Sequence, residues 1–246
     1  MRNSSSFIII LLLLACHAAT AQQDNKKEVI RELNGLMARY QSADHLSFSI
    51  NYKYAMEDKP SFFLDSMQGQ FKMHGSLYSY SIDNTESIVG SDYSIMLFKE
   101  DQVMYLSKPA ANAQTGNPLA MPDTTYLASN DVTCSIAETK GEKRISLEFK
   151  PGGGCRRIDY YIDKKTGYVT RMVSLVHSSQ LYDESVRSAV EGNAYAIVEM
   201  QFGNYRQKSF DDTELDTSKY FTKEGKEFVT TASYKSYKIF LGTPNL

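Results

Sequence analysis

Residues 46–54 read Leu-Ser-Phe-Ser-Ile-Asn-Tyr-Lys-Tyr, and this alternation of apolar and polar side chains decides the fold class. Successive side chains of a strand point to opposite faces of a sheet, so a period of two predicts a strand with one buried face. The same alternation recurs at 67–73. The chain also has 17 tyrosines and 12 phenylalanines, and aromatic residues favour strands. We therefore expect a mainly β fold.

Shorter segments continue the strand pattern toward the C-terminus. Residues 109–125 are typical of a long loop, 178–192 of a short helical insertion and 211–221 of an acidic loop. About eleven strands after one helix predict an α+β, mainly β fold with a large curved antiparallel sheet or an incompletely closed β-barrel. The further strands are expected at 78–82, 87–90, 93–99, 103–107, 132–138, 143–149, 156–162, 168–177, 195–206 and 228–241.

Residues 26–41 are expected to form one amphipathic helix that precedes the strands. Its apolar residues recur at the spacing that places them on one helix face. Asn25 is positioned to cap the N-terminus, with Glu28 three residues on as in a capping box. Gly35 weakens the middle of the helix by about 1 kcal/mol. The apolar stripe consists of Val29, Ile30, Leu33, Leu36, Met37 and Tyr40.

The N-terminus has the features of a secretory signal peptide. Arg2 supplies a positive charge, residues 7–15 are wholly apolar, and Ala19-Thr20-Ala21 matches an A-x-A cleavage site. The apolar run is much shorter than the roughly 20 residues that a membrane-spanning helix needs. No later run matches it. We therefore expect residues 1–21 to be removed, leaving a periplasmic protein with no membrane span.

A second interpretation applies to the same segment. Leu13-Leu14-Ala15-Cys16 resembles a bacterial lipobox, in which the cysteine is lipidated and becomes the new N-terminus. Lipidation of Cys16 would anchor the protein to the inner or outer membrane, whereas cleavage after Ala21 would leave it diffusing in the periplasm.

The remaining residues, 22–246, are expected to form a single domain. The insertion at 178–192 and a C-terminal extension at 222–246 are additions that could cover an exposed sheet edge. With 27 Lys and Arg against 29 Asp and Glu, the charge is nearly balanced. This balance gives no electrostatic basis for binding nucleic acid.

Two cysteines, Cys134 and Cys155, remain after cleavage behind Ala21. Export permits a disulfide between them. A simple meander would instead place them two strands apart, beyond the roughly 7 Å that a disulfide can span. Only a curled glycine loop at 152–154 could bring the two cysteines together. The sequence alone therefore leaves open whether the disulfide forms.

The sequence carries little sign of catalytic chemistry. The mature chain has three histidines, His45, His74 and His177, and their spacing is not that of metal ligands. His74 stands beside Ser76 in a turn-like stretch, and the paired carboxylates also lie in turns, where acidic residues are common. No phosphate-binding loop, nucleophile elbow or dinucleotide fingerprint occurs. We expect no enzyme activity, no metal and no cofactor.

The order of elements resembles the periplasmic lipoprotein carrier LolA and its relatives LolB and RseB. The segments that carry the resemblance are 46–50, 69–73, 92–98, 102–105, 158–169, 200–205 and 220–221, and they span most of 26–222. One departure is the stretch His74-Gly75-Ser76, which stands where the carrier has an Arg-Pro turn.

The resemblance implies an open barrel whose concave face binds the acyl chains of lipids or lipoproteins beneath a helical lid. The expected partners are these acyl chains and other envelope proteins. The alternative is a structural or protein-interaction module of the cell envelope with a packed interior. The candidate lining of the hydrophobic cavity comprises Leu33, Leu36, Met37 and Tyr40 from the helix, with Phe48, Ile50, Phe71, Met73, Ile95 and Leu97 from strands.

Overall fold

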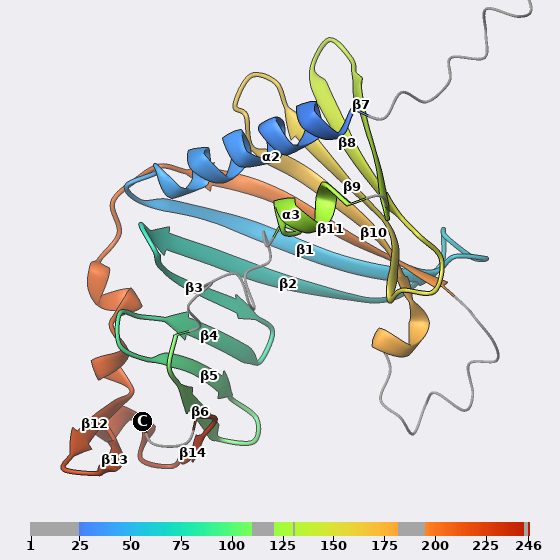
Figure 1. Ribbon diagram of the computed structural model, residues 1–246. Coiled ribbons are helices and arrows are strands. Elements are labelled where there is room, and N and C mark those ends of the chain that lie inside the picture. The colour runs from blue at the N-terminus through green and yellow to red at the C-terminus, as the bar shows by residue number, and fades with distance from the viewer. Residues whose placement is uncertain (1–24, 110–120, 130, 182–194, 244–245) are drawn as a thin grey trace, which may run out of the picture.

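The computed structural model describes residues 25–109, 121–129, 131–181, 195–243 and 246. The expected signal segment with Cys16, most of the 109–125 loop and most of the 178–192 insertion lie outside these residues. Figure 1 shows a large curved sheet with one long helix across its concave face. The elements are α2 (Lys26–Gln41), β1 (Leu46–Met56), β2 (Phe63–His74), β3 (Leu77–Ile82), β4 (Thr85–Val89), β5 (Ser94–Phe98), β6 (Val103–Ser107), α3 (Thr124–Leu127), β7 (Val132–Glu138), β8 (Glu142–Phe149), β9 (Cys155–Asp163), β10 (Val169–His177), η1 (Ser178–Gln180), β11 (Tyr195–Arg206), η2 (Asp212–Leu215), η3 (Thr217–Lys219), β12 (Phe221–Glu224), β13 (Glu227–Thr230), η4 (Ala232–Tyr234) and β14 (Lys238–Leu241).

Helix α2 has the bounds that the sequence predicts, and its apolar stripe faces the sheet. Val29, Leu33, Leu36 and Tyr40 are buried. The predicted capping box is wrong, because the Asn25 side chain makes no capping hydrogen bond. The Asn25 backbone N–H instead donates to the carbonyl of Cys134, 3.1 Å away, which ties the start of α2 to β7.

The main sheet has 12 strands in the order β14-β6-β5-β4-β3-β2-β1-β11-β10-β9-β8-β7. Its two ends, β14 and β7, are not paired to each other, so the sheet is open. Neighbouring strands are antiparallel except β14, which pairs parallel with β6. The predicted curved, incompletely closed sheet with a helix in its concave face is confirmed. The sheet is mixed because of β14 alone.

The C-terminal segment differs from the single strand predicted at 228–241. It forms β13, then the turn η4, then β14. The turn is held by the hydroxyl of Thr231, which donates to the carbonyl of Lys219, 2.7 Å away. It also brings the ring of Tyr234 to 4.8 Å from that of Tyr220. A straight strand could not make these contacts and then pair with β6. The alternation of apolar and polar residues therefore predicts one continuous strand here, where the chain in fact turns.

Residues 211–221, predicted as a loop, contain η2 and η3. Short polar side chains accept hydrogen bonds from the first backbone N–H groups of such turns. Asp211 accepts from the N–H of Thr213, and Asp216 accepts from the N–H of Ser218. The acidic residues that suggested a loop therefore cap two helical turns.

The two faces of the sheet bury separate cores. The larger core lies between α2 and the strands from β7 through β11 and β1 to β3. The smaller core lies on the opposite face of β4, β5 and β6, beneath the C-terminal segment. Its members are Ile88, Ile95, Leu97, Met104, Leu106, Tyr220 and Phe221.

Strand β14 also covers the edge of β6, which places the C-terminal extension where it was expected, on a sheet edge. Ile239 pairs with Met104 and Phe240 with Tyr105. Proteins protect such edges because unpaired backbone groups invite pairing with other chains. The extension of the sheet by β14 also adds one aromatic residue, Phe240, to the concave face.

Candidate functional site

The strand register shows which side chains line the concave face. Leu46, Phe48 and Ile50 of β1 pair with Met73, Phe71 and Gly69 of β2, so these side chains share one face. Phe71 in turn pairs with Tyr80 of β3, and Tyr80 pairs with Ser87 of β4. The concave face is therefore apolar and aromatic from β1 to β3, and it includes the buried polar residue Ser87 in β4.

Eight of the ten predicted lining residues meet in the core beneath α2. Leu33 is 1 % exposed, Phe48 1 % and Phe71 0 %. The rings of Phe48 and Phe71 stack at 4.8 Å. Because these residues fill the space between helix and sheet with one another, they form a packed core in this conformation, and their binding of a ligand stays a prediction. The eight residues are Leu33, Leu36, Met37, Tyr40, Phe48, Ile50, Phe71 and Met73.

Ile95 and Leu97 are not near the other predicted lining residues. Ile95 pairs with Ile88, and both belong to the smaller core on the opposite face. The prediction that Ile95 and Leu97 line the same cavity is wrong. The error has a simple cause, because a shift of one residue along a strand inverts the face.

The neighbours of these two residues are the ones on the concave face. Met96 pairs with Ser87 and with Tyr105. The ring of Tyr105 stacks on Phe240 at 5.5 Å and meets Phe98 edge-on at 5.8 Å. We call these residues the open apolar face: Met96, Phe98, Val103, Tyr105 and Phe240.

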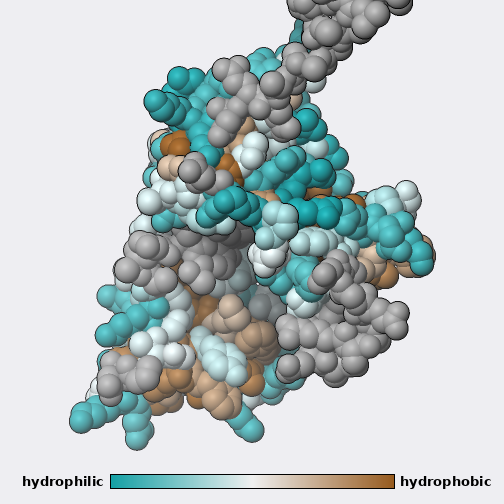
Figure 2. Space-filling view, turned by 45° about the vertical axis from the view of Figure 1, so that its right-hand side comes forward, coloured by the Kyte–Doolittle hydropathy of each residue, from teal (hydrophilic) through white to brown (hydrophobic). Residues whose placement is uncertain are grey.

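The open apolar face differs from the core beneath α2 in being exposed. Met96 is 37 %, Tyr105 46 % and Phe240 46 % exposed. Figure 2 shows apolar residues gathered on the lower part of the molecule, over β4, β5, β6 and β14, below a hollow. Contiguous exposed apolar patches mark binding sites on soluble proteins. The sequence contains a signal for this face, since residues 95–98 are all apolar, as in a strand with two apolar faces.

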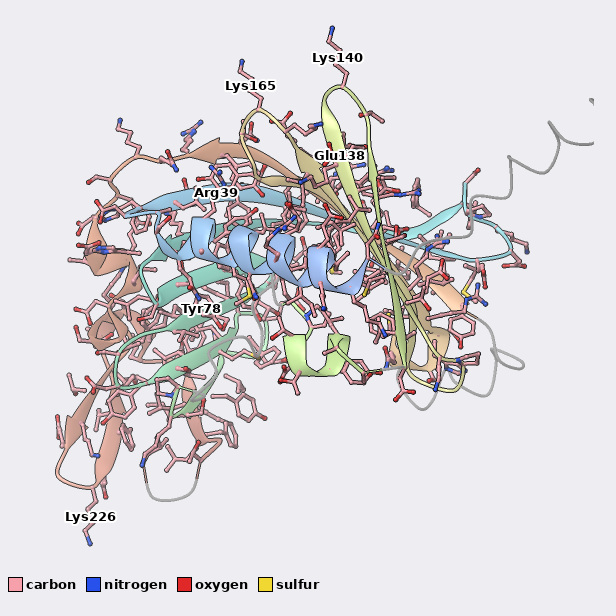
Figure 3. The ribbon with its side chains drawn as sticks, turned by 45° about the horizontal axis from the view of Figure 1, so that its top comes forward. Arg39, Tyr78, Glu138, Lys140, Lys165 and Lys226 are labelled. Carbon is pink, nitrogen blue, oxygen red and sulfur yellow. The ribbon has the colours of Figure 1, made fainter. Side chains whose placement is uncertain are left out.

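A polar pocket of about 370 Å³ lies on the other side of α2, between the helix and the β7–β8 and β9–β10 hairpins. Lys143 bonds Glu32 there at 2.7 Å, and the guanidinium of Arg39 donates to the carbonyl of Thr166 at 3.3 Å. Figure 3 shows Lys140 and Lys165 pointing away from the body at the tips of these two hairpins. The pocket is charged, so it does not offer the apolar lining that an acyl chain needs.

Three tyrosines fix the C-terminal end of α2 to the sheet. The N–H of Val169 donates to the Tyr40 hydroxyl at 3.2 Å, and the Tyr205 hydroxyl donates to the carbonyl of Val169 at 2.7 Å. The Tyr168 and Tyr205 rings stack at 4.5 Å. Burial raises the pKa of Tyr40 to about 12 and raises that of Tyr205 as well. Both hydroxyls are therefore neutral near pH 7.

Cys134 and Cys155 are not joined by a disulfide. Cys134 pairs with Leu147 of β8, and Leu147 pairs with Ile158 of β9, so the meander separates the two cysteines by two strands. Burial raises the pKa of the Cys155 thiol. The disulfide that the glycine loop would have allowed is absent for this geometric reason.

Within the residues that the structure describes, no helix combines the length and apolar character needed to cross a bilayer.

Comparison with family models finds no match, and neither does comparison with curated proteins. Solved structures do show similarity. A LolA superfamily protein from Nitrosomonas europaea has a TM-score of 0.36 and 6 % identity, over 76 % of this chain and 98 % of that one. A Thermus thermophilus protein has a TM-score of 0.42 and 9 % identity, over 77 % and 91 %.

A protein of the DUF1329 family from Desulfovibrio piger is also similar, with a TM-score of 0.37 and 10 % identity over 80 % of this chain and 99 % of that one.

Proposed function

We propose that this protein binds the acyl chains of lipids or lipoproteins, without catalysis, on the concave face of its sheet. One observation carries the proposal: the open apolar face continues the buried core of the same sheet face outward to solvent. Met96, Tyr105 and Phe240 are exposed, although the strand pairing places them on the same face of the sheet as that core. An apolar ligand on this surface would remove both its own methylenes and these side chains from water.

The energetics favour a hydrocarbon ligand over a polar one. Each methylene that leaves water contributes about 0.8 kcal/mol, so a chain of about 16 carbons offers on the order of 10 kcal/mol before the cost of ordering it. The stacked rings of Tyr105 and Phe240 provide an apolar surface on the open apolar face. A charged neighbour, Lys238, pairs with Val103 at one end of β14. Aromatic rings of this kind contribute a large apolar area at low entropic cost.

The ligand is proposed to lie over β4, β5, β6 and β14 while α2 stays in place. The residues beneath α2 are already in contact with one another, with Val29 at 0 % and Leu33 at 1 % exposure. Entry beneath the helix would require breaking the hydrogen bonds of Tyr40 with Tyr205 and Val169. This path costs more than binding at the exposed part of the same face.

Binding of a fluorescent fatty acid by the purified mature protein tests the proposal. Tyr105→Asp and Phe240→Asp each place a carboxylate on the open apolar face and should weaken binding at least tenfold. Val229→Asp is the matched control, because Val229 is 39 % exposed on β13, outside that face. Saturable binding that all three variants retain would contradict the proposed site, and no binding by the wild type would contradict the function.

The second candidate is an envelope structural or protein-interaction module, and the packed core beneath α2 favours it. In that case the open apolar face would be covered by another protein, and the fatty acid would not bind while an envelope partner would. We propose a periplasmic location for either function, reached through the signal segment. The mass of the mature N-terminus distinguishes cleavage after Ala21 from lipidation of Cys16.

A further inference from the structure

Two histidines and two aspartates from separate segments meet at the end of the β1–β2 hairpin. Asp44 and His45 lie between α2 and β1, His74 ends β2, and Asp212 begins η2. The two imidazole rings stack at 4.1 Å with 25° between their planes. Leu46 pairs with Met73 in the sheet, so the register places His45 beside His74 although they are distant in sequence.

Each ring lies between the two carboxylates. Asp212 Oδ1 lies 2.9 Å from His45 Nε2 and 2.9 Å from His74 Nδ1. On the other side, Asp44 Oδ2 lies 3.2 Å from His45 Nδ1, and Asp44 Oδ1 lies 3.3 Å from His74 Nε2. One carboxylate therefore faces one nitrogen of each ring, and the second carboxylate faces the other nitrogen.

We propose that Asp44, His45 Nδ1 and His74 Nε2 bind a divalent transition-metal cation such as Zn²⁺. One potential ligand atom from each of these three residues lies within 4.8 Å of the other two. Ligands held about 2.1 Å from one ion at tetrahedral or octahedral angles lie roughly 3.0–3.4 Å apart. Asp44 lies at this spacing from both rings through its two oxygens, Oδ2 at 3.2 Å from His45 Nδ1 and Oδ1 at 3.3 Å from His74 Nε2, so it would bind the ion through the whole carboxylate.

His45 supplies an independent observation. Its Nδ1 atom is buried and makes no hydrogen bond, although the Asp44 carboxylate is near. A buried polar atom without a partner is costly, and coordination of a cation would satisfy it. The His45 side chain is only 11 % exposed, whereas that of Asp44 is 85 % exposed, so the site is open to an ion from the Asp44 side.

Asp212 acts as the orienting partner. Histidine ligands of metals usually donate their second ring N–H to a carboxylate, which fixes the tautomer. Asp212 Oδ1 is placed to accept from His45 Nε2 and His74 Nδ1. These two hydrogen bonds leave the lone pairs of His45 Nδ1 and His74 Nε2 directed at the Asp44 side.

The ligand types select the class of ion. Two imidazoles and one carboxylate suit Zn²⁺, Ni²⁺, Co²⁺ or Cu²⁺, whereas Ca²⁺ and Mg²⁺ prefer oxygen ligands. The bound ion would join the start of β1, the end of β2 and, through Asp212, the C-terminal segment. It would therefore raise the thermal stability of the folded chain.

Calorimetry with Zn²⁺ and visible absorption with Co²⁺, on untagged mature protein, test the site. The wild type should bind one ion per chain. His74→Ala and Asp44→Ala should each weaken binding at least tenfold, and Asp212→Asn should weaken it about 10- to 100-fold. His177→Ala is the control, because His177 bonds Ser179 outside this cluster and should leave binding unchanged.

Folding is followed in the same samples by circular dichroism, and Zn²⁺ should raise the melting temperature of the wild type and of His177→Ala but not that of His74→Ala. No binding by the folded wild type would overturn the proposal. Equal binding by folded His74→Ala and Asp44→Ala would overturn it too. Neither result depends on lipid binding.

Discussion

The hydroxyl oxygens of Tyr40 and Tyr205 lie 2.9 Å apart, and they close a ring of hydrogen bonds through both backbone groups of Val169. Tyr40 is in the last turn of α2, and Tyr205 is near the end of β11. This ring joins the helix to β10 and β11. These hydrogen bonds add to the apolar packing beneath α2, and they fix the position of the helix on the sheet.

Tyr205→Phe should lower the free energy of unfolding by about 1–3 kcal/mol, because it removes the hydroxyl that donates to the Val169 carbonyl and that accepts from the Tyr40 hydroxyl in a buried site. Chemical denaturation followed by circular dichroism measures this change. Tyr126→Phe is the control, since Tyr126 is 48 % exposed and should change stability little. Equal stability of the two variants would show that the ring of hydrogen bonds contributes nothing.

Stability should fall as the pH rises above about 10. Burial raises the pKa of Tyr40, Tyr52 and Tyr78 to about 12, against 10 in the unfolded chain. Between these values the unfolded state loses protons that the folded state keeps, so stability is full below pH 10 and is lost as the pH approaches 12. Denaturation midpoints across this range measure the loss, and a flat profile would contradict the burial of the hydroxyls.

Gly167→Ala should destabilise the protein by about 1–2 kcal/mol. Gly167 has a φ of +71°, and an added Cβ would lie 2.7 Å from Arg39 Nε. Gly141→Ala is the matched control in the neighbouring hairpin, because a Cβ there meets nothing within 4 Å. A Gly167→Ala midpoint equal to that of Gly141→Ala would argue against the docking of Arg39 on this turn.

Gly35→Ala should stabilise α2 by about 1 kcal/mol, the difference between the two residues within a helix. The added methyl has open space, since nothing lies within 4 Å of it. Because acyl chains are proposed to bind outside the helix, fatty-acid affinity should be unchanged. Slower binding by this variant would indicate instead that α2 must open as a lid.

Leu97→Ala and Met96→Ala separate the two faces of β5. Leu97 is 0 % exposed in the smaller core, so its truncation should cost about 2–5 kcal/mol and leave the affinity of the folded protein unchanged. Met96→Ala should change stability little and weaken fatty-acid binding. Titration and denaturation of both variants give the comparison, and the reverse pattern would invert the assignment of the faces.

The sequence predicts α2, β1 and β2 well because each has one clear period. Leu33, Phe48 and Phe71 meet as expected, since alternation and helical spacing each leave one apolar face. In β5 the alternation does not show which residues face the core beneath α2, because residues 95–98 are all apolar and so both faces of the strand are apolar. Only the register through β3 and β4 decides that Met96 faces α2's side of the sheet while Ile95 does not.

The histidine pair shows a different limit. His45 and His74 carry no metal-ligand spacing along the chain, so a search by spacing misses them. Pairing the predicted strands 46–54 and 67–73 as one hairpin would have placed the two histidines together. His45 directly precedes Leu46 and His74 directly follows Met73, and these two residues pair in the sheet. The contribution of Asp212 depends on the path of the C-terminal segment, which no local pattern encodes.

Photo-crosslinking of a diazirine-labelled fatty acid, followed by mass spectrometric mapping, shows where on the sheet the acyl chain binds. Saturable labelling is expected within 94–98, 103–107 and 238–241, the strands that carry the open apolar face. Labelling confined to α2 and β1, or labelling that unlabelled fatty acid does not displace, would contradict it.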